Sequence, residues 1–248
     1  MNQARFKFFD ELNDLLAPEK KGAGFTCSFR DHQSVKHLIE ALGVPHTEVM
    51  QVLANDRPVQ FDYIVQDGDQ IEVYPFRSTV GAPSQSLPDG APHFIIDNHL
   101  GKLTKSLRML GFDCLYRNDY QDEELARLAA QEGRTLLTRD RRLLMRKIII
   151  SGYCVRDLDP QRQVQEVMRR FNLYAAIQPF RRCINCNGLL QPVSKGAVLD
   201  RLEPLTKQYF DEFRICPECS QVYWKGSHFE HMQQLIRQVL GEEEEDSI

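Results

Sequence analysis

Two pairs of cysteines near the C-terminal end limit most sharply what this chain can fold into. Each pair has the form Cys-x-x-Cys, and 29 residues separate Cys183 and Cys186 from Cys216 and Cys219. One such turn presents two thiolates to an ion, and two turns complete the tetrahedral four-sulfur site that zinc prefers. A site with four protein ligands leaves no open position, so we expect a structural zinc in a ribbon. Redox-active thiols and unligated core cysteines are the alternatives.

The other three cysteines, Cys27, Cys114 and Cys154, stand alone in apolar surroundings and are typical of small core residues. They do not form the dispersed even set that would indicate disulfides in a secreted chain. Residues Met1 to Asp10 lack the pattern of a signal peptide. No apolar run reaches the roughly 20 residues of a membrane-spanning helix. We therefore expect a cytoplasmic protein with no membrane partner.

A segment rich in Ser, Pro and Gly, RSTVGAPSQSLPDGAP, predicts a linker at 77–92. A run of glutamates predicts an acidic tail at 241–248. The predicted folded parts are a first domain at 1–76, a second at 93–180, and the zinc ribbon with a closing helix at 181–240.

The first domain has the element order of a β-grasp, or ubiquitin-like, fold. Its helix is predicted at Val35–Leu42, between a capping Ser34 and a terminating Gly43. Strands are predicted at Arg5–Phe9, Gly24–Phe29, Val49–Ala54, Pro58–Phe61 and Gln70–Tyr74.

Part of this domain, VLANDRPVQFDYIVQDGDQIEVYP, resembles the small sulfur-carrier proteins of thiamine and molybdopterin synthesis. Those carriers end in two glycines, whose terminal carboxylate is activated. Here Tyr74-Pro75-Phe76 leads into the linker without a Gly-Gly pair, which argues against sulfur transfer. Docking of a protein partner and a purely structural role remain as alternatives.

After the linker, strand and helix patterns alternate, which predicts an α/β domain with a parallel sheet covered on both faces. The predicted strands are His93–Ile96, Asp113–Arg117, Arg134–Thr138 and Ile148–Val155. The predicted helices are Lys102–Leu110, Gln121–Gln131, Arg141–Arg146 and Pro160–Phe171.

Carboxylates follow two of these strands. Asp97 ends the first strand and Asp140 follows the third, and ligands of parallel sheets bind at the carboxyl ends of strands. The helix beginning near Gln121 adds further acids at its start: Asp119, Asp122, Glu123 and Glu124. Three or four convergent carboxylates suit Mg²⁺ or Mn²⁺, which can activate a water against a phosphodiester. Acids in a first helical turn also complement the helix dipole, so Asp122, Glu123 and Glu124 have a structural explanation too.

The segment FIIDNHLGKLTKSLRMLGFDCLYRNDYQDEELARLAAQEGRTLLTRDRRLL resembles the PIN nuclease superfamily. More closely, it is similar to the family named for the C-terminal ribonuclease domain of the Mut-seven exonuclease. That family carries a four-cysteine ribbon after the nuclease core, and bacterial members can carry a ubiquitin-like domain before it. All three parts occur here in that order.

The resemblance implies a ribonuclease in which Asp97, Asp122 and Asp140 hold magnesium or manganese. Glu123 and Asp119 are the adjacent candidates. PIN nucleases often have a fourth acid after the equivalent of Asp140, whereas this chain has basic residues there.

Basic side chains near these acids could bind the RNA backbone. Lys102, Lys105 and Arg108 have the spacing of one helix face. With Arg139, Arg141, Arg142 and Arg146 they would line a path for phosphates. The region 94–180 holds 15 basic and 11 acidic side chains. A solvated helix face explains the helical set equally well.

Two functions from different classes follow. The leading one is a metal-dependent ribonuclease that hydrolyses RNA, with a possible protein partner on the ubiquitin-like domain. The alternative is a catalytically weak or inactive adaptor that binds RNA or associates with the ribosome. Near the second cysteine pair, Tyr223 and Trp224 could stack on unpaired bases, although such residues more often cover a small core.

Overall fold

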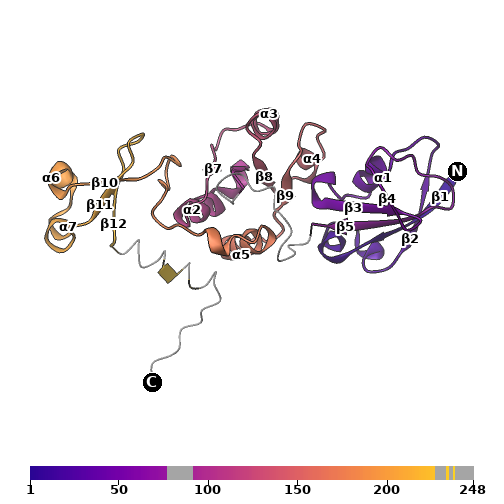
Figure 1. Ribbon diagram of the computed structural model, residues 1–248, viewed down its shortest axis with the longest axis horizontal. Coiled ribbons are helices and arrows are strands. Elements are labelled where there is room, and N and C mark those ends of the chain that lie inside the picture. Colours follow the sequence, from indigo (N-terminus) through magenta and orange to yellow (C-terminus); the bar gives the residue numbers. More distant parts are fainter. Residues whose placement is uncertain (77–91, 227–232, 235–236, 238–248) are drawn as a thin grey trace, which may run out of the picture. The chain divides into compact units, whose positions relative to one another are not determined.

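The computed structural model describes residues 1–76, 92–226, 233, 234 and 237, and Figure 1 shows its elements. The described residues fall into two compact units, one drawn from 1–82 and 120–155 and the other from 83–119 and 156–248. The strand order is β2-β1-β5-β3-β4 in the five-stranded sheet of the first unit and β10-β11-β12 in the three-stranded sheet of the second unit. Nearly all of the predicted linker, closing helix and acidic tail lies outside the described residues.

The N-terminal part of the first unit is the predicted β-grasp fold. Its strand β1 pairs in parallel with β5 and antiparallel with β2, while β3 pairs antiparallel with β5 and β4. The bounds are β1 Asn2–Phe8, β2 Phe25–Phe29, α1 Val35–Ala41, β3 Val49–Ala54, β4 Arg57–Val59 and β5 Gln70–Pro75. Short 3-10 turns lie at η1 Asp10–Leu15, η2 Pro18–Lys20 and η3 His46–Glu48.

Local sequence explains how this fold begins and ends its elements. Alternate residues of β1 are buried, including Phe6 and Phe8, so one face of the strand builds the core. The Ser34 hydroxyl caps α1 by accepting a hydrogen bond from the His37 N–H at 3.3 Å. Gly43 follows the helix with a φ of +96°, a conformation that costs glycine little. The predicted helix start and stop are confirmed.

The rest of the first unit consists of α3 Asp122–Glu132, β8 Thr135–Thr138, α4 Arg141–Leu144 and β9 Gly152–Cys154. The strands β8 and β9 are parallel and fully buried, as expected for strands covered on both faces. Gly133 ends α3 in the left-handed conformation, with a φ of +61°. The observed β9 is shorter than the predicted strand 148–155, because residue 148 lies in a turn, residues 149 and 150 are irregular and residue 151 lies in a bend.

The second unit begins with β6 Phe94–Ile96, η4 Asn98–Leu100, α2 Gly101–Met109 and β7 Cys114–Leu115. It continues with α5 Pro160–Arg170 and η5 Tyr174–Ala176. Strands β6 and β7 are parallel, and helices α2 and α5 pack against one another. Asp159 caps α5 by accepting from the N–H groups of Gln161 and Arg162, both at 3.0 Å.

The ribbon at the end of the second unit is an antiparallel sheet of β10 Gln191–Val193, β11 Phe213–Ile215 and β12 Val222–Trp224. Between β10 and β11 lie α6 Lys195–Val198, η6 Leu199–Arg201 and α7 Pro204–Tyr209. Val198, Leu202, Phe213 and Val222 form its small apolar core. Among the described residues, no helix is long and apolar enough to cross a membrane.

Candidate functional site

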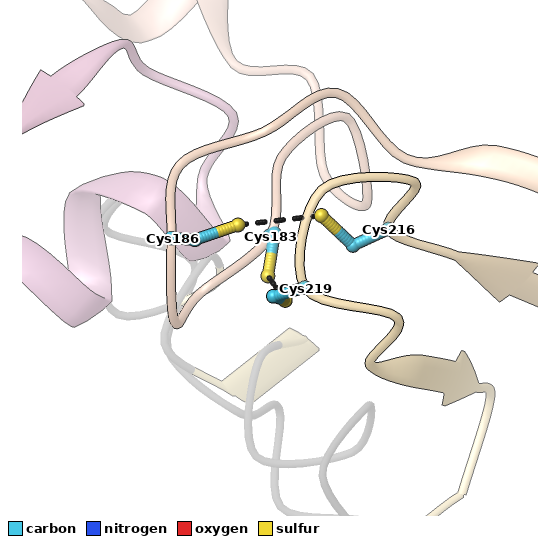
Figure 2. A group of neighbouring side chains, drawn as sticks. All are labelled: Cys183, Cys186, Cys216 and Cys219. Atoms are coloured by element: carbon cyan, nitrogen blue, oxygen red, sulfur yellow. Dashed lines mark hydrogen bonds between the residues drawn. The ribbon is translucent and has the colours of Figure 1, made fainter.

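The four cysteines of the two Cys-x-x-Cys turns meet in a cluster, with their sulfur atoms all within 4.8 Å of one another. Figure 2 shows that each close pair joins the two turns: Cys183 to Cys219 at 3.5 Å and Cys186 to Cys216 at 3.3 Å. These distances exceed the ~2.05 Å of a disulfide bond. They approach the ~3.8 Å edge of a tetrahedron with Zn–S distances of ~2.3 Å. The cluster therefore fits a metal ion such as zinc.

The two turns share one hydrogen-bond pattern, which explains why they present their sulfurs in the same way. In the first turn, the Cys183 N–H donates to the Gly188 carbonyl at 2.8 Å, and the Asn187 N–H donates to the Cys183 carbonyl at 2.9 Å. The second turn has the equivalent bonds from Cys216 N to Gln221 O, 2.9 Å, and from Ser220 N to Cys216 O, 2.8 Å. Asn187 and Ser220 both adopt positive φ, at +73° and +60°.

Tyr223 of β12 favours ionisation of one cysteine of the cluster, Cys183, whereas burial raises the pKa of Cys186 and Cys219. Its hydroxyl lies 3.1 Å from the Cys183 sulfur and accepts a hydrogen bond from the Ile184 N–H at 3.1 Å. Burial opposes ionisation of Cys183, but hydrogen bonds from Tyr223 and from backbone N–H groups outweigh it and lower its pKa to about 7. Burial raises the pKa of Tyr223, so its hydroxyl stays protonated as a donor. A thiolate is the form that binds metal.

Arg108 of α2 holds the first turn in place from inside the unit. Its guanidinium donates to the Cys114 carbonyl at 3.0 and 2.8 Å, to the Ile184 carbonyl at 3.0 Å and to the Asn185 carbonyl at 2.7 Å. The residue is only 3% exposed, and burial lowers its pKa. The expectation that Arg108 shares a solvent-facing helix side with Lys102 and Lys105 is therefore corrected. Arg108 is buried and hydrogen-bonded to carbonyl groups, so its role is structural.

Asn187 makes a second connection between this turn and β7. Its side chain accepts from the Cys114 N–H at 3.0 Å and donates to Asp113 Oδ1 at 2.9 Å. The other carboxylate oxygen of Asp113 lies 3.1 Å from Arg182 Nη2. The first Cys-x-x-Cys turn is thus bonded to β7 and the residue before it, and not to the ribbon alone.

Two of the predicted acids lie in the second unit in contrasting surroundings. Asp97 directly follows β6 and is only 6% exposed. Asp119 is exposed, and Arg117 donates to both of its oxygens, at 3.0 and 2.6 Å. That hydrogen-bonded pair lowers the pKa of Asp119. Of the two, Asp97 has the buried position expected of a functional carboxylate.

The other predicted acids lie in the first unit. Asp122 and Glu123 occupy the first turn of α3, and Arg146 Nη2 lies 3.7 and 3.0 Å from their carboxylates. A backbone hydrogen bond and Arg146 lower the pKa of Glu123. Asp140 caps α4 by accepting from the Arg142 N–H at 2.8 Å. Each unit thus carries part of the predicted set, and the convergence of Asp97 with Asp122 and Asp140 stays a prediction.

The predicted RNA-binding residues differ in exposure. Lys102, Lys105, Arg139 and Arg142 are exposed. Arg141 is only partly exposed, and its guanidinium donates to the Leu15 carbonyl of the β-grasp part at 2.6 Å. The structure thus uses Arg141 in a contact within the first unit.

Two further residues of the β-grasp part make contacts that sequence reasoning missed. Glu48 is 1% exposed, and its carboxylate accepts a hydrogen bond from the Cys154 N–H at 2.6 Å. His46 bridges the Glu40 carboxylate at 2.7 Å and the Ile149 carbonyl at 2.9 Å. The turn η3 is thereby bonded to β9 and the loop before it. The sequence of a three-residue turn such as η3 does not indicate which distant segment the turn will contact.

Comparison with known proteins agrees with this arrangement. The family model described as the Mut7-C RNAse domain matches residues 92–236, and the model described as Mut7-C ubiquitin matches residues 1–80. A curated relative, the exonuclease mut-7 homolog of Homo sapiens, is 34% identical over 113 residues, which is 43% of this chain. The match spans only 13% of that relative's length. No solved structure matches the chain. Because the first of these models covers more than half of the residues, the chain belongs to the Mut7-C RNAse domain family.

Proposed function

We propose that this protein is a metal-dependent ribonuclease that hydrolyses RNA phosphodiester bonds through a PIN-like carboxylate site. The observation that carries the proposal is the match of the Mut7-C RNAse domain to residues 92–236. The curated relative that matches 113 residues of this chain is named an exonuclease, which supports nuclease chemistry in this chain.

The position of Asp97 supports the proposal independently. Burying a carboxylate is costly unless a cation or hydrogen-bond donors compensate for the lost water. A strand-end carboxylate that is 6% exposed is therefore a suitable ligand for a hard cation, which prefers oxygen donors. The proposal requires Asp122 and Asp140 to join it, with Glu123 and Asp119 as adjacent candidates.

Magnesium or manganese at this site would supply activation of a water and stabilisation of the leaving oxygen. Lys102, Arg139 and Arg142 would bind and orient the phosphates of the strand. Zinc at the four cysteines would be structural, because all four ligand positions come from the protein. The ubiquitin-like part would offer a surface to a protein partner, and we place the protein in the cytoplasm.

One observation favours the second candidate, an adaptor that binds RNA without cutting it. Arg146 lies beside both Asp122 and Glu123, and Arg117 pairs with Asp119. Arginines that already compensate these acids reduce the negative charge available to a cation. In an adaptor, the acids at the start of α3 would serve the helix dipole.

Cleavage of labelled single-stranded and structured RNA by the zinc-loaded protein in Mn²⁺ tests the proposal. Asp97→Asn and Asp140→Asn remove the candidate carboxylates one at a time. Asparagine also caps helices well, so Asp140→Asn leaves the start of α4 intact. Asp62→Asn, at an exposed position of the β-grasp part, is the matched control.

The ribonuclease proposal expects cleavage by the native protein and by Asp62→Asn, and at least a ~100-fold loss in the two site variants, as for groups that act on developing charge. RNA binding measured without Mn²⁺ should survive in all four proteins. Equal cleavage by all four would refute the carboxylate site. Retained RNA binding with no cleavage by the native protein would establish the adaptor.

A further inference from the structure

A pocket of about 420 Å³ lies in the second unit between α2 and the ribbon. Its lining is mostly apolar and includes three aromatic rings. Met109 of α2, Phe180, Ile184, Leu190, Tyr223 and Trp224 contribute to it. Lys105 of α2 and Arg182 also line it, as do Asn185 and Gln221, whose side chains carry amide groups.

We propose that this pocket binds one unpaired base of an RNA strand, with Lys105 contacting the neighbouring phosphate. The proposal rests on the proposed function, because it assigns a site to the RNA that the carboxylates would cut. It goes beyond that function by naming a base-binding site outside the carboxylate set.

The size and lining of the pocket suit a nucleobase. Ligand pockets of proteins typically enclose about 300 to 1,000 Å³ and combine apolar walls with a few polar groups. Every base has a planar face that stacks on aromatic side chains, whichever base it is. Single-stranded RNA exposes such faces, and amide groups can bond to the edges of the base. Asn185 and Gln221 offer both donors and acceptors for that purpose.

The positive charges of α2 also favour a ligand that carries phosphate groups. Lys105 is exposed and forms no ion pair in the part of the chain that the structure describes. Lys102 lies three residues before it on the same helix face. The helix begins at Gly101, shortly after Asp97, and Lys105 lies ~6 Å further along its axis. The basic side of α2 therefore leads from the strand end that carries Asp97 to the pocket.

Hydrogen bonds within the protein fix the walls of the pocket without a ligand. Arg108 fixes the carbonyls of Ile184 and Asn185 beside the pocket, at 3.0 and 2.7 Å. The hydroxyl of Tyr223 is fixed by Cys183 and Ile184, both at 3.1 Å. A preformed pocket binds with less loss of conformational entropy than one that must be assembled. These bonds also tie the pocket to the cysteine cluster.

Trp224 is the single tryptophan of the chain, so its fluorescence reports on this pocket alone. The full-length protein, with zinc bound and no added Mg²⁺ or Mn²⁺, is titrated with a labelled single-stranded oligoribonucleotide. Anisotropy of the label measures overall binding, and quenching of Trp224 measures occupancy of the pocket. A tetrahydrofuran-phosphate oligomer of equal length and charge, which carries no bases, is the matched ligand.

We expect saturable quenching by the oligoribonucleotide and about tenfold weaker binding of the oligomer without bases, the size typical of one stacked base. Lys105→Glu should weaken binding about fivefold or more. Lys21→Glu, the same charge change at an exposed site of the β-grasp part, should stay within about twofold of the native protein.

Saturable anisotropy without quenching, or equal binding of both ligands, overturns the proposal and leaves the pocket to another occupant, such as an apolar side chain of a partner protein. An equal effect of the two lysine variants overturns the role of Lys105. Cleavage assayed on the same preparations separates the two proposals. Cleavage without quenching would refute only the proposed base-binding pocket. Quenching without cleavage would refute only the proposed ribonuclease activity.

Discussion

Around the cysteine cluster, single residues are packed so closely that there is little space for a larger side chain. A Cβ at Gly188 would lie 3.0 Å from the Cys216 sulfur and 2.7 Å from the carboxyl carbon of Glu218. Glu218 can move aside because its side chain is flexible, whereas the Cys216 sulfur is packed among the three other sulfurs of the cluster. An added Cβ at this position would therefore require the second turn to shift by a few tenths of an ångström.

Alanine at position 188 would disturb that contact. Gly188→Ala should weaken zinc retention by about tenfold, the lower range for disturbed support of metal ligands. Competition with a colorimetric zinc chelator measures the change. Gly196→Ala is the control, because a Cβ there meets no atom within 4 Å. Equal zinc retention in both variants would show that the turn adapts to the extra methyl.

Arg108 separates structural from RNA-binding arginines. Lysine keeps the charge, but its donors all lie on one nitrogen, which cannot replace the planar fork of three nitrogens that bonds the three carbonyls. Arg108→Lys should lower the free energy of unfolding by ~2 kcal/mol, the value of hydrogen bonds from a charged group. Denaturant unfolding measures it, with the exposed Arg127→Lys as control. A variant of native stability that binds RNA poorly would contradict the structural role.

At the scale of elements, the β-grasp part of the first unit is bonded to the segment around β9. Glu48 of the turn η3 accepts a hydrogen bond from the Cys154 N–H of β9. Arg141, at the start of α4, donates to the Leu15 carbonyl of the β-grasp part. Asp140, the residue before Arg141, caps the same helix. A role of the ubiquitin-like part in holding α4 follows from these bonds, beside any partner that it recruits.

This connection predicts different effects of two substitutions. Glu48→Gln keeps an acceptor for the Cys154 N–H, whereas Glu48→Ala leaves that buried donor unsatisfied. The alanine variant should lose ~2 kcal/mol of unfolding free energy and the glutamine variant ~1 kcal/mol or less. Denaturant unfolding measures both, with the exposed Glu19→Ala as control. Equal losses in the alanine and glutamine variants would mean that the charge, and not the hydrogen bond, matters.

Considered as a whole molecule, the chain obtains its stability from different sources in different regions. The β-grasp part has an apolar core that includes Phe6, Leu12, Ile39 and Ile71. The ribbon core is much smaller, with four buried apolar residues and a second small cluster around Cys183, Leu190 and Cys216. Small metal-binding units commonly owe most of their folding free energy to the ion.

Removal of zinc should therefore affect the chain unequally. Hydrogen exchange followed by mass spectrometry should show lost protection in peptides from 181–226 and retained protection in peptides from 1–76. Peptides containing Arg108 should lose some protection, because its partners Ile184 and Asn185 belong to the first turn. Uniform loss of protection over the whole chain would contradict this division.

The sequence by itself determined the β-grasp fold, the alternation of strands and helices, and the cysteine cluster. Periodicity, caps and the spacing of Cys-x-x-Cys turns are local signals, and Ser34, Gly43 and Gly133 mark helix ends in the same local way. The helices α6 and α7 escaped sequence analysis because they are short and carry weak periodicity.

Only the tertiary structure decided what the charged side chains do. Lys102, Lys105 and Arg108 have identical spacing, yet Arg108 is buried against the first cysteine turn while the two lysines face solvent. Glu48 and Arg141 likewise find their partners in distant segments. Burial and hydrogen bonding depend on which distant segments come into contact on folding, and local residue patterns do not specify those contacts.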